Sequence, residues 1–348
     1  MSDADASTVP FLSVVIPTFN RRDSLEVTLE ALARQLQVPG GFEVVVVSDG
    51  STDGTDTFLA GWASRPDLPY VLRVVNQDNG GPAKARNRGV AEARGTVVVF
   101  LDDDVEPLPQ CLSAHAARHR DDPMLVLIGP MSPDPHRRSA EPVWIAWEHA
   151  MLEKQYRSFR LGIWTDDDCG PNNFYTGNAS VRRDHIRRVG GFDEGFTRQE
   201  DVELAVRLER ECKVHFRFDP TPGALHRPTR TFASWLRVPY AYGKLDVVRA
   251  QRGDASWKRL RDLFRSRQRA TQVLAHFVLP SERRGVVLRG TLRRVAELLY
   301  AVPMGSAQRV GLSMLSALYN VHYLEGARDE LGAWPALREV LARPITQS

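Results

Sequence analysis

The chain has 348 residues, of which 43% are hydrophobic and 26% are charged. This length and composition suit a globular protein with one large core and a smaller helical addition. No apolar run reaches the roughly 18 to 20 residues of a membrane-spanning helix, and residues 1–10 lack the basic and apolar regions of a signal peptide. We therefore expect a cytoplasmic protein.

Charge is distributed unevenly along the chain. Residues 1–226 contain 25 Lys and Arg against 34 Asp and Glu, a net charge of −9, whereas residues 227–348 contain 21 against 9, a net charge of +12. The acidic part argues against a nucleic-acid partner. The basic part suits an anionic surface, so peripheral contact with the inner face of a membrane, or with a lipid-linked or phosphorylated acceptor, is one interpretation of it.

The cysteines indicate no special chemistry. Cys111, Cys169 and Cys212 are odd in number and widely spaced, and the sequence contains no Cys-x-x-Cys pair. This pattern favours ordinary thiols in a reducing compartment over disulfides or a zinc site.

The first hundred residues alternate between apolar strands and amphipathic helices. Strands are expected at Phe11–Ile16, Phe42–Val47, Val71–Val75 and Thr96–Leu101. Helices are expected at Ser24–Gln37, around Phe58 and Trp62, and at Pro82–Ala93. Pro17 closes the first strand, and Leu36 belongs to the apolar stripe of the first helix. This alternation predicts an α/β fold with a mainly parallel sheet wound by right-handed crossovers.

The periodicity is poorer from Asp121 to Trp164, where prolines favour loops. The elements expected from there on are a strand at Leu125–Ile128, a helix containing Trp144 and Trp147, an extended segment at Asn173–Val181, a helix at Asp201–Glu211 and a strand at Val214–Phe218. Beyond His226 the chain is Arg-rich, and its apolar residues at helical spacing are Leu288, Leu292, Val295 and Leu299, then Val310, Met314, Leu318 and Val321. Such stripes usually face a core, and docking on a membrane is the alternative.

Three carboxylates, Asp102–Asp104, directly follow the apolar run Val97–Leu101. Ligands of open α/β sheets gather at the carboxyl ends of such strands. Adjacent carboxylates repel one another, so a bound cation is the natural compensation. A solvated acidic turn is the alternative.

Six motifs occur in a fixed order along the chain: Val14–Arg21, Ser48–Thr55, Gly80–Gly89, Phe100–Asp104, Gly190–Glu194 and Glu200–Leu204. Together they resemble the family 2 glycosyltransferases of the GT-A fold. The resemblance covers residues 11 to about 230 and implies a Rossmann-like, mainly parallel central sheet flanked by helices. It implies a catalytic domain at 1–230, with a nucleotide-binding half at about 11–110 and an acceptor half at about 111–230. An Arg-rich helical region at 231–348 follows.

The resemblance also implies how a nucleotide-sugar donor is held. In this family the aspartate matching Asp49 accepts the ring N–H of uracil, although Asp49 can also simply close a turn with Gly50. Ser48 departs from the family, because it replaces the first acid of the usual Asp-Asp-Gly-Ser turn. The other residues implied in donor binding are Pro17 and Thr18 beside the base, Arg86 and Lys84 facing the diphosphate, Asp102 near the ribose, Gly177 and Asn178 along the sugar, and Asn20 and Asp103. For Lys84 the alternative is an exposed position on the side of a helix.

Departure of a nucleoside diphosphate needs charge neutralisation, which a divalent cation supplies. The resemblance implies Asp104 as the main metal ligand, Asp102 as the other acid of an Asp-x-Asp motif, and His226 as the residue that completes the shell. Oxygen ligands favour Mg²⁺ or Mn²⁺, and an imidazole shifts the preference toward Mn²⁺. A purely structural histidine is the alternative for His226.

Glu200 and Asp201 form a second acidic pair, at the start of an expected helix. In the family one of these carboxylates removes the proton of the acceptor hydroxyl, and we assign Asp201 as this base and Glu200 as its neighbour. The alternative is a favourable interaction with the helix dipole, which needs no catalytic role.

The expected function is therefore metal-dependent, inverting transfer of a sugar from a nucleotide sugar, with UDP-sugars as the expected donors, to an acceptor hydroxyl. Two other functions stay open: a binding or assembly protein that keeps the GT-A fold without turnover, and a sugar-1-phosphate nucleotidyltransferase. The latter expects a glycine-rich phosphate loop after the first strand, and Pro17–Arg22 contains no glycine.

Overall fold

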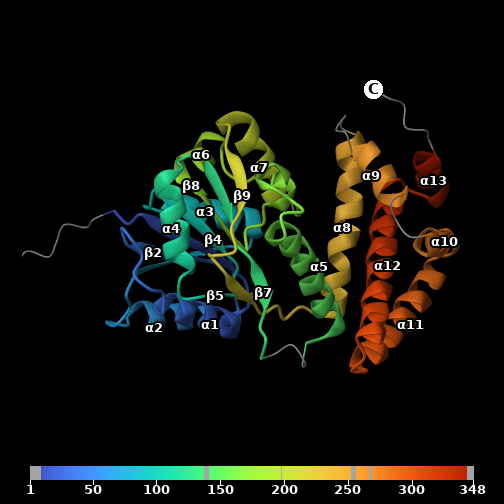
Figure 1. Ribbon diagram of the computed structural model, residues 1–348, viewed down its shortest axis with the longest axis horizontal. Coiled ribbons are helices and arrows are strands. Elements are labelled where there is room, and N and C mark those ends of the chain that lie inside the picture. The colour runs from blue at the N-terminus through green and yellow to red at the C-terminus, as the bar shows by residue number, and fades with distance from the viewer. Residues whose placement is uncertain (1–8, 137–140, 197, 252–255, 266–268, 343–348) are drawn as a thin grey trace, which may run out of the picture. The chain divides into compact units, whose positions relative to one another are not determined.

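The computed structural model describes residues 9–136, 141–196, 198–251, 256–265 and 269–342. The chain divides into two compact units (Figure 1). The sheet unit consists of Met1–Arg137 and Met151–Thr229, and the helical unit consists of Arg138–Ala150 and Arg230–Ser348.

Seven strands form the central sheet of the sheet unit, in the order β3-β2-β1-β4-β8-β6-β9. Their bounds are β1 Leu12–Thr18, β2 Phe42–Asp49, β3 Val71–Gln77, β4 Val97–Leu101, β6 Leu125–Ile128, β8 Asn178–Arg182 and β9 His215–Phe218. All run parallel except β8, which is antiparallel to both of its neighbours. A smaller sheet has the order β5-β10-β7 and consists of β5 (Val105–Pro107), β7 (Met131–Pro133) and β10 (Ala224–His226).

Helices cover both faces of the central sheet. One face carries α1 (Arg22–Ala33), α2 (Thr55–Ala63) and α4 (Cys111–Asp121), and the other carries α3 (Pro82–Glu92), α6 (Arg183–Arg188) and α7 (Glu200–Arg207). The sequence of β4 explains why both faces are covered. All of its residues are apolar and buried, and successive side chains point alternately into the buried cluster on one face of the sheet and the cluster on the other. The predicted α/β fold with a mainly parallel sheet is confirmed.

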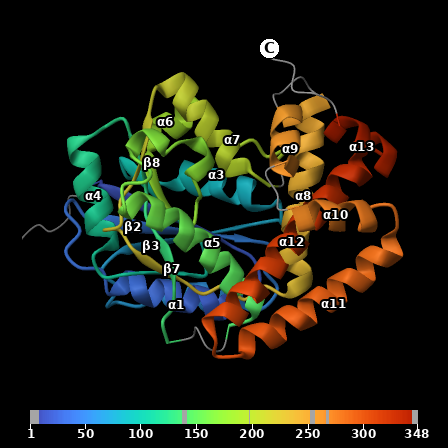
Figure 2. The same ribbon diagram turned by 45° about the vertical axis from the view of Figure 1, so that its right-hand side comes forward.

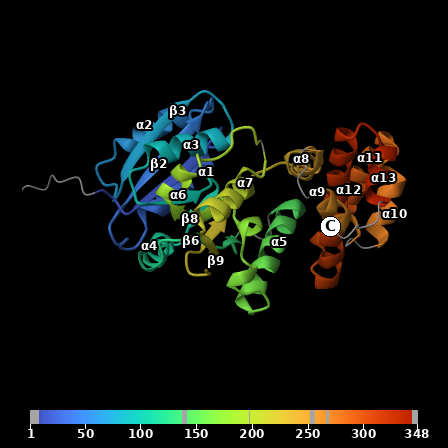
Figure 3. The same cartoon turned by 90° about the horizontal axis from the view of Figure 1, so that it is seen from above.

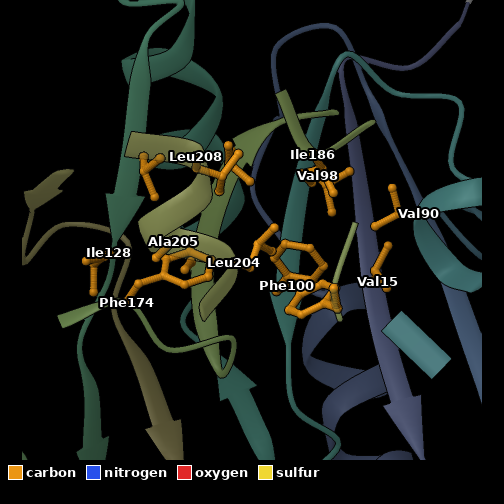
Figure 4. Packing of buried hydrophobic residues seen from close by; sticks show 14 of the residues in the cluster. Val15, Val90, Val98, Phe100, Ile128, Phe174, Ile186, Leu204, Ala205 and Leu208 are labelled. Carbon is orange, nitrogen blue, oxygen red and sulfur yellow. The ribbon is translucent and has the colours of Figure 1, made fainter. Parts of the chain in front are cut away.

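Apolar packing fixes α7 against the central sheet. Leu204, Ala205 and Leu208 belong to the same buried cluster as Val98 and Phe100 of β4 (Figure 4). Because β4 leads directly into the three aspartates, this packing ties the start of α7 to the strand that carries them. Helix α7 ends in a π-helical turn, η3 (Leu208–Cys212), where the sequence predicted one continuous helix.

Several predicted element ends are wrong. β1 continues through Pro17. It pairs with β4 only over Leu12–Val15, so on that side no strand requires a hydrogen bond from the proline, which has no N–H to donate. α1 ends at Ala33, so Leu36 is 59% exposed, and its backbone N–H donates to Pro109 instead of continuing the helix. After α5 (Val143–Arg160), the turns η1 (Asp166–Asp168) and η2 (Pro171–Asn173) delay the extended structure until β8.

The helical unit contains α8 (Phe232–Gln251), α9 (Ser256–Arg265), α10 (Arg269–Val278), α11 (Glu282–Ala301), α12 (Gly305–Glu330) and α13 (Trp334–Ala342) (Figure 2, Figure 3). α8 and α12 approach closely at glycines: a Cβ at Gly243 would lie 1.8 Å from the carbonyl oxygen of Tyr323. The interpretation that the apolar stripes face a core is confirmed for Leu318 and Val321 of α12 and wrong for Val310, which is exposed. None of the helices in the described part of the chain combines the length and the apolar character needed to cross a membrane.

Candidate active site

The guanidinium of Arg86 joins two groups of acids that lie far apart in the sequence. Its Nη2 is 2.8 Å from Oδ1 of Asp102, and its Nη1 is 2.9 Å from Oε1 of Glu200. Arg86 comes from the buried side of α3 and is 5% exposed. Arg86 therefore links Asp102, one of the predicted metal-binding acids, to Glu200, the neighbour of the predicted base.

Asp103 and Asp104 have an arginine of their own. Nη1 of Arg21 lies 2.5 Å from Oδ2 of Asp104 and 3.4 Å from Oδ1 of Asp103. Thr18, the last residue of β1, donates its hydroxyl to Asp103 over 2.8 Å. Burial, reinforced by the charge of Asp104, raises the pKa of Asp103 to about 7, although Arg21 opposes this shift. The three aspartates are thus an ion-paired, mostly buried cluster rather than a solvated turn.

His226 reaches this cluster through strand pairing. β10 pairs antiparallel with β5, which follows the aspartates, and His226 stands opposite Val105. Nε2 of His226 lies 3.7 Å from Oδ1 of Asp104, and both residues are buried. The backbone N–H of Arg227 donates to the carbonyl of Asp104, which fixes the two segments together.

These side chains fit a cation only in combination with a substrate. Within the described residues, no three His, Cys, Asp or Glu side chains lie close enough together to hold a metal by themselves. Mg²⁺ in proteins is commonly held by one or two carboxylates together with phosphate oxygens of the substrate. The pair of Asp104 and His226, whose Oδ1 and Nε2 atoms lie 3.7 Å apart, fits such a partial shell.

Asp49 lies at the end of β2 and is held by protein donors. Its carboxylate accepts hydrogen bonds from the side chain of Gln77 and from the backbone N–H groups of Gly80 and Gly81, at 2.7 to 2.9 Å. A carboxylate offers about four lone-pair positions, so one remains for a ligand. These contacts reach the segment before α3 rather than merely closing the local turn with Gly50.

Two residues predicted to bind the donor have clear structural partners. Asn20 has a positive φ of 53°, and its side-chain oxygen accepts the backbone N–H of Thr52 over 2.7 Å, which pins the loop after β1 to the turn after β2. Lys84 is exposed in the first turn of α3, and its stem lies over Gly80, where a Cβ would be 2.3 Å from Cδ of the lysine. Pro17 and Thr18 end β1, beside the end of β2.

Gly177 and Asn178 are adjacent in the sequence but face different surroundings. A Cβ at Gly177 would lie 3.2 Å from Oδ2 of Asp102, so its backbone runs directly beside that carboxylate. The side chain of Asn178 is fully buried, donates to the carbonyl oxygens of Pro130 and Pro222, and lies 3.1 Å from Nε2 of His115. The structure therefore brings Gly177 to the acidic cluster and gives the Asn178 side chain to the protein interior.

The environment of Asp201 suits proton transfer. It lies in the first turn of α7, after Gln199, whose φ is 59°, and the helix start shows no side-chain cap hydrogen bond. Burial of the carboxyl group and the neighbouring charge of Glu200 raise the pKa of Asp201 to about 7. Oδ1 of Asp201 accepts only the adjacent backbone N–H of Val202, over 2.8 Å, among the hydrogen bonds described for it. A carboxyl group whose pKa is near neutrality is well matched to general-base catalysis.

Comparison with known proteins adds the family to this geometry. The family model described as glycosyl transferase family 2 matches residues 13–189, which is half of the chain. The chain belongs to glycosyl transferase family 2. The match contains the aspartate cluster and Arg86 and ends before Glu200, Asp201 and His226.

Two relatives with named activities match part of this family 2 chain at 30% identity or more. Validoxylamine A glucosyltransferase of Streptomyces hygroscopicus subsp. limoneus is 37% identical over 222 residues, 58% of this chain and 48% of that protein. Chondroitin synthase of Pasteurella multocida is 30% identical over 225 residues, 57% of this chain and 23% of that protein. The chain spans about half the length, or less, of these relatives.

A solved structure supports the fold over most of the chain. The mannosyltransferase of Pyrobaculum calidifontis, in complex with GDP-Man and Mn²⁺, matches with a TM-score of 0.58 and 20% identity, covering 93% of this chain and 89% of that one. The predicted GT-A fold of this family 2 chain is confirmed by this likeness.

Sequence reasoning missed Arg21 as a site residue. Arg21 ends the first family 2 motif, three residues after Thr18, at the carboxyl end of β1. A cation at the carboxyl end of one strand, next to a strand that ends in three acids, was a signal that could have identified it.

Proposed function

We propose that this chain is a metal-dependent, inverting glycosyltransferase that moves a sugar from a nucleotide-sugar donor, with UDP-sugars as the expected class, to an acceptor hydroxyl. The observation that carries the proposal is the bridge from Asp102 through Arg86 to Glu200. It joins acids suited to a cation and a diphosphate to a carboxyl pair suited to deprotonating a hydroxyl. The glucosyltransferase and mannosyltransferase named above support sugar transfer as the class of reaction.

The donor would lie over the carboxyl ends of β1, β2 and β4. Asp49 offers its remaining acceptor position to the ring N–H of the base, between protein donors that keep its carboxylate in place. Gly177 runs beside Asp102, and a Cβ there would lie 2.4 Å from the sulfur of Met131, so glycine is what lets the backbone approach this carboxylate so closely.

Asp104, His226 and Asp102 would hold Mn²⁺ or Mg²⁺ together with the diphosphate. When bound, the ion supplies charge neutralisation for the departing nucleoside diphosphate. The combination of carboxylate and imidazole favours Mn²⁺ over Mg²⁺.

Asp201 would accept the proton of the acceptor hydroxyl. The acceptor oxygen forms a bond to the anomeric carbon, the bond to the diphosphate oxygen breaks with its electron pair, and the proton ends on the Asp201 carboxylate. Glu200, held by Arg86 over 2.9 Å, keeps a negative charge next to the base and helps to raise its pKa to about 7. One base and a direct displacement invert the configuration, so an α-linked donor gives a β-linked product.

Replacement of the base tests this proposal. Asp201→Asn keeps the size of the side chain and removes its basicity, so turnover should fall by about 10² to 10⁴-fold. The melting temperature should not fall, because the variant removes a buried charge that costs stability, and its rise on adding the preferred nucleotide sugar with Mn²⁺ should remain. The preferred donor is found first by measuring melting shifts with a panel of UDP- and GDP-sugars.

Glu203→Gln provides the matched control on the same helix. Glu203 forms a partly buried ion pair with Arg207 one turn along α7, and none of the contacts described for it involves Arg86, so this variant should retain turnover. Full turnover by Asp201→Asn would exclude Asp201 as the base. Donor binding without turnover by the parent chain, over a range of acceptors, would favour the alternative of a binding or assembly protein.

A further inference from the structure

The outward side of α11 combines arginines with exposed apolar side chains. The residues that lie there at helical spacing, all exposed, are Arg283, Val287, Gly290, Arg294, Leu298 and Ala301. Val287 is 68% exposed and Leu298 is 71% exposed. This spacing places the six residues on one side of the helix, and we call them the basic apolar stripe.

Neighbouring segments add to the exposed apolar surface of this part of the chain. α10 exposes Val273 and Phe277, and the guanidinium of Arg284 from α11 lies 4.8 Å from the centroid of the Phe277 ring. Of the 17 large apolar side chains that are exposed in the described residues, eight lie between Val273 and Val310. Scattered single apolar residues are ordinary on protein surfaces, but so many exposed apolar side chains within one segment of the chain favour an interaction surface there.

The helical unit does not use the basic apolar stripe for its own core. The opposite side of α11 packs on α12, where a Cβ at Gly311 would lie 3.0 Å from the carbonyl oxygen of Ala296 (Figure 2). Arg289 turns to this inner side and pairs with Glu325 of α12 over 2.8 Å. The inner side therefore satisfies the packing of α11, and the outward arginines and apolar residues need a different explanation.

Charge decides which partner suits the stripe. The segment Arg269–Val310 contains seven Arg, two Glu and no Asp or Lys, a net charge of +5. A second copy of this chain is disfavoured, because a two-fold contact would set the arginines of one stripe against those of the other. A nucleic acid would pair with the arginines but would leave the valine and leucine side chains without apolar contacts.

We propose that the basic apolar stripe docks the helical unit on an anionic phospholipid bilayer. Arg283 and Arg294 meet the headgroup phosphates, while Val287 and Leu298 enter the boundary between the headgroups and the acyl chains. α11 lies in the plane of the interface, as suits a described helix that cannot span the membrane. This docking is independent of the proposed sugar transfer.

Vesicle sedimentation with the full chain tests the docking. The chain should bind vesicles of phosphatidylglycerol mixed with phosphatidylcholine, less at high salt than at low salt, and should bind pure phosphatidylcholine vesicles far more weakly. The double variant Arg283→Gln/Arg294→Gln should bind the anionic vesicles about 25-fold more weakly, since each arginine near the surface accounts for about a fivefold change. Leu298→Glu should reduce binding by about tenfold or more.

Two matched controls lie in the sheet unit. Arg187→Gln/Arg188→Gln removes the same charge from exposed positions of α6, and Leu36→Glu makes the same change of side chain at another exposed leucine. Both should bind vesicles like the parent, and thermal melting shows whether each variant is folded.

Equal losses in the two arginine variants, or full binding by Leu298→Glu, would overturn the proposal. A dimer seen by light scattering that Leu298→Glu dissociates would identify a second copy as the partner instead. Melting shifts with nucleotide sugars, measured on the same samples, report on the transferase site alone, so the two proposals can fail separately.

Discussion

The sheet unit and the helical unit place arginines in different surroundings, and the comparison shows two different roles for a positive charge. In the sheet unit Arg86 is buried and fixed between two carboxylates at 2.8 and 2.9 Å. In the helical unit Arg283 and Arg294 are exposed on the outward side of α11. A buried, paired charge holds other groups at fixed positions, whereas an exposed charge on a long side chain attracts a surface of opposite sign.

The largest expected effect comes from removing the buried charge. Arg86→Met would leave Asp102 and Glu200 facing each other without their shared partner. Breaking a buried ion pair in this way costs about 3 to 5 kcal/mol, and the loss should appear in the urea-induced unfolding of the sheet unit at neutral pH.

Arg88→Met is the control on the same helix. Arg88 is exposed and pairs with Glu92 one turn later, and such surface pairs contribute about 0.5 kcal/mol or less. Equal losses of stability in the two variants would contradict the contrast between buried and exposed arginines.

Buried histidines should make the sheet unit sensitive to acid. His115 and His119 of α4 both contact the hydroxyl of Ser180, and burial lowers the pKa of His115 to about 4 and that of His119 to about 3. In the unfolded chain these imidazoles bind protons below pH of about 6.5. Their stabilising effect is therefore complete above about pH 6.5 and declines as the pH falls toward 4, by about 1.4 kcal/mol per pH unit for each group.

Urea unfolding at several pH values between neutrality and pH 4 measures this decline. His119→Gln removes one of the two imidazoles and should reduce the slope of stability against pH. His276→Gln, at an exposed position of α10, should leave the slope unchanged. An unchanged slope in His119→Gln would show that acid unfolding has another origin.

The sequence predicted the central sheet well because strands buried on both faces consist of uninterrupted apolar residues. β6 has the predicted bounds of Leu125–Ile128, and β4 begins one residue later than expected. The ends of other elements depend on tertiary partners that no local pattern contains. Pro17 remains in β1 because of where β4 stops pairing, and Leu36 leaves α1 to bond with Pro109.

The candidate site was predictable as a set of residue types but not as a set of contacts. The motifs named the acids, yet the link between them runs through Arg86, which is 114 residues from Glu200 in the sequence. Asn178 follows Gly177, but the alternation of β8 turns its side chain toward His115 and away from the position that the resemblance implied.

Arg21 is intermediate in burial between Arg86 and the exposed arginines of α11, and its replacement gives the smallest expected change in free energy. Its side chain is 30% exposed and pairs with Asp104, the proposed metal ligand, and with Asp103. A guanidinium and a divalent cation at one carboxylate compete, because each is repelled by the other's charge. Arg21→Gln should therefore bind Mn²⁺ about tenfold more tightly in the absence of donor, a change of about 1.4 kcal/mol.

Titration of Mn²⁺ followed by electron paramagnetic resonance measures this affinity without any turnover. Arg34→Gln is the control, because Arg34 pairs with Glu30 and Glu106 from an exposed position of the chain that follows α1. If Mn²⁺ affinity is unchanged in Arg21→Gln, then Arg21 and the cation do not share Asp104. Asp102, which Arg86 joins to Glu200, would then be the next carboxylate to test as a metal ligand, by the same titration of an Asp102→Asn variant.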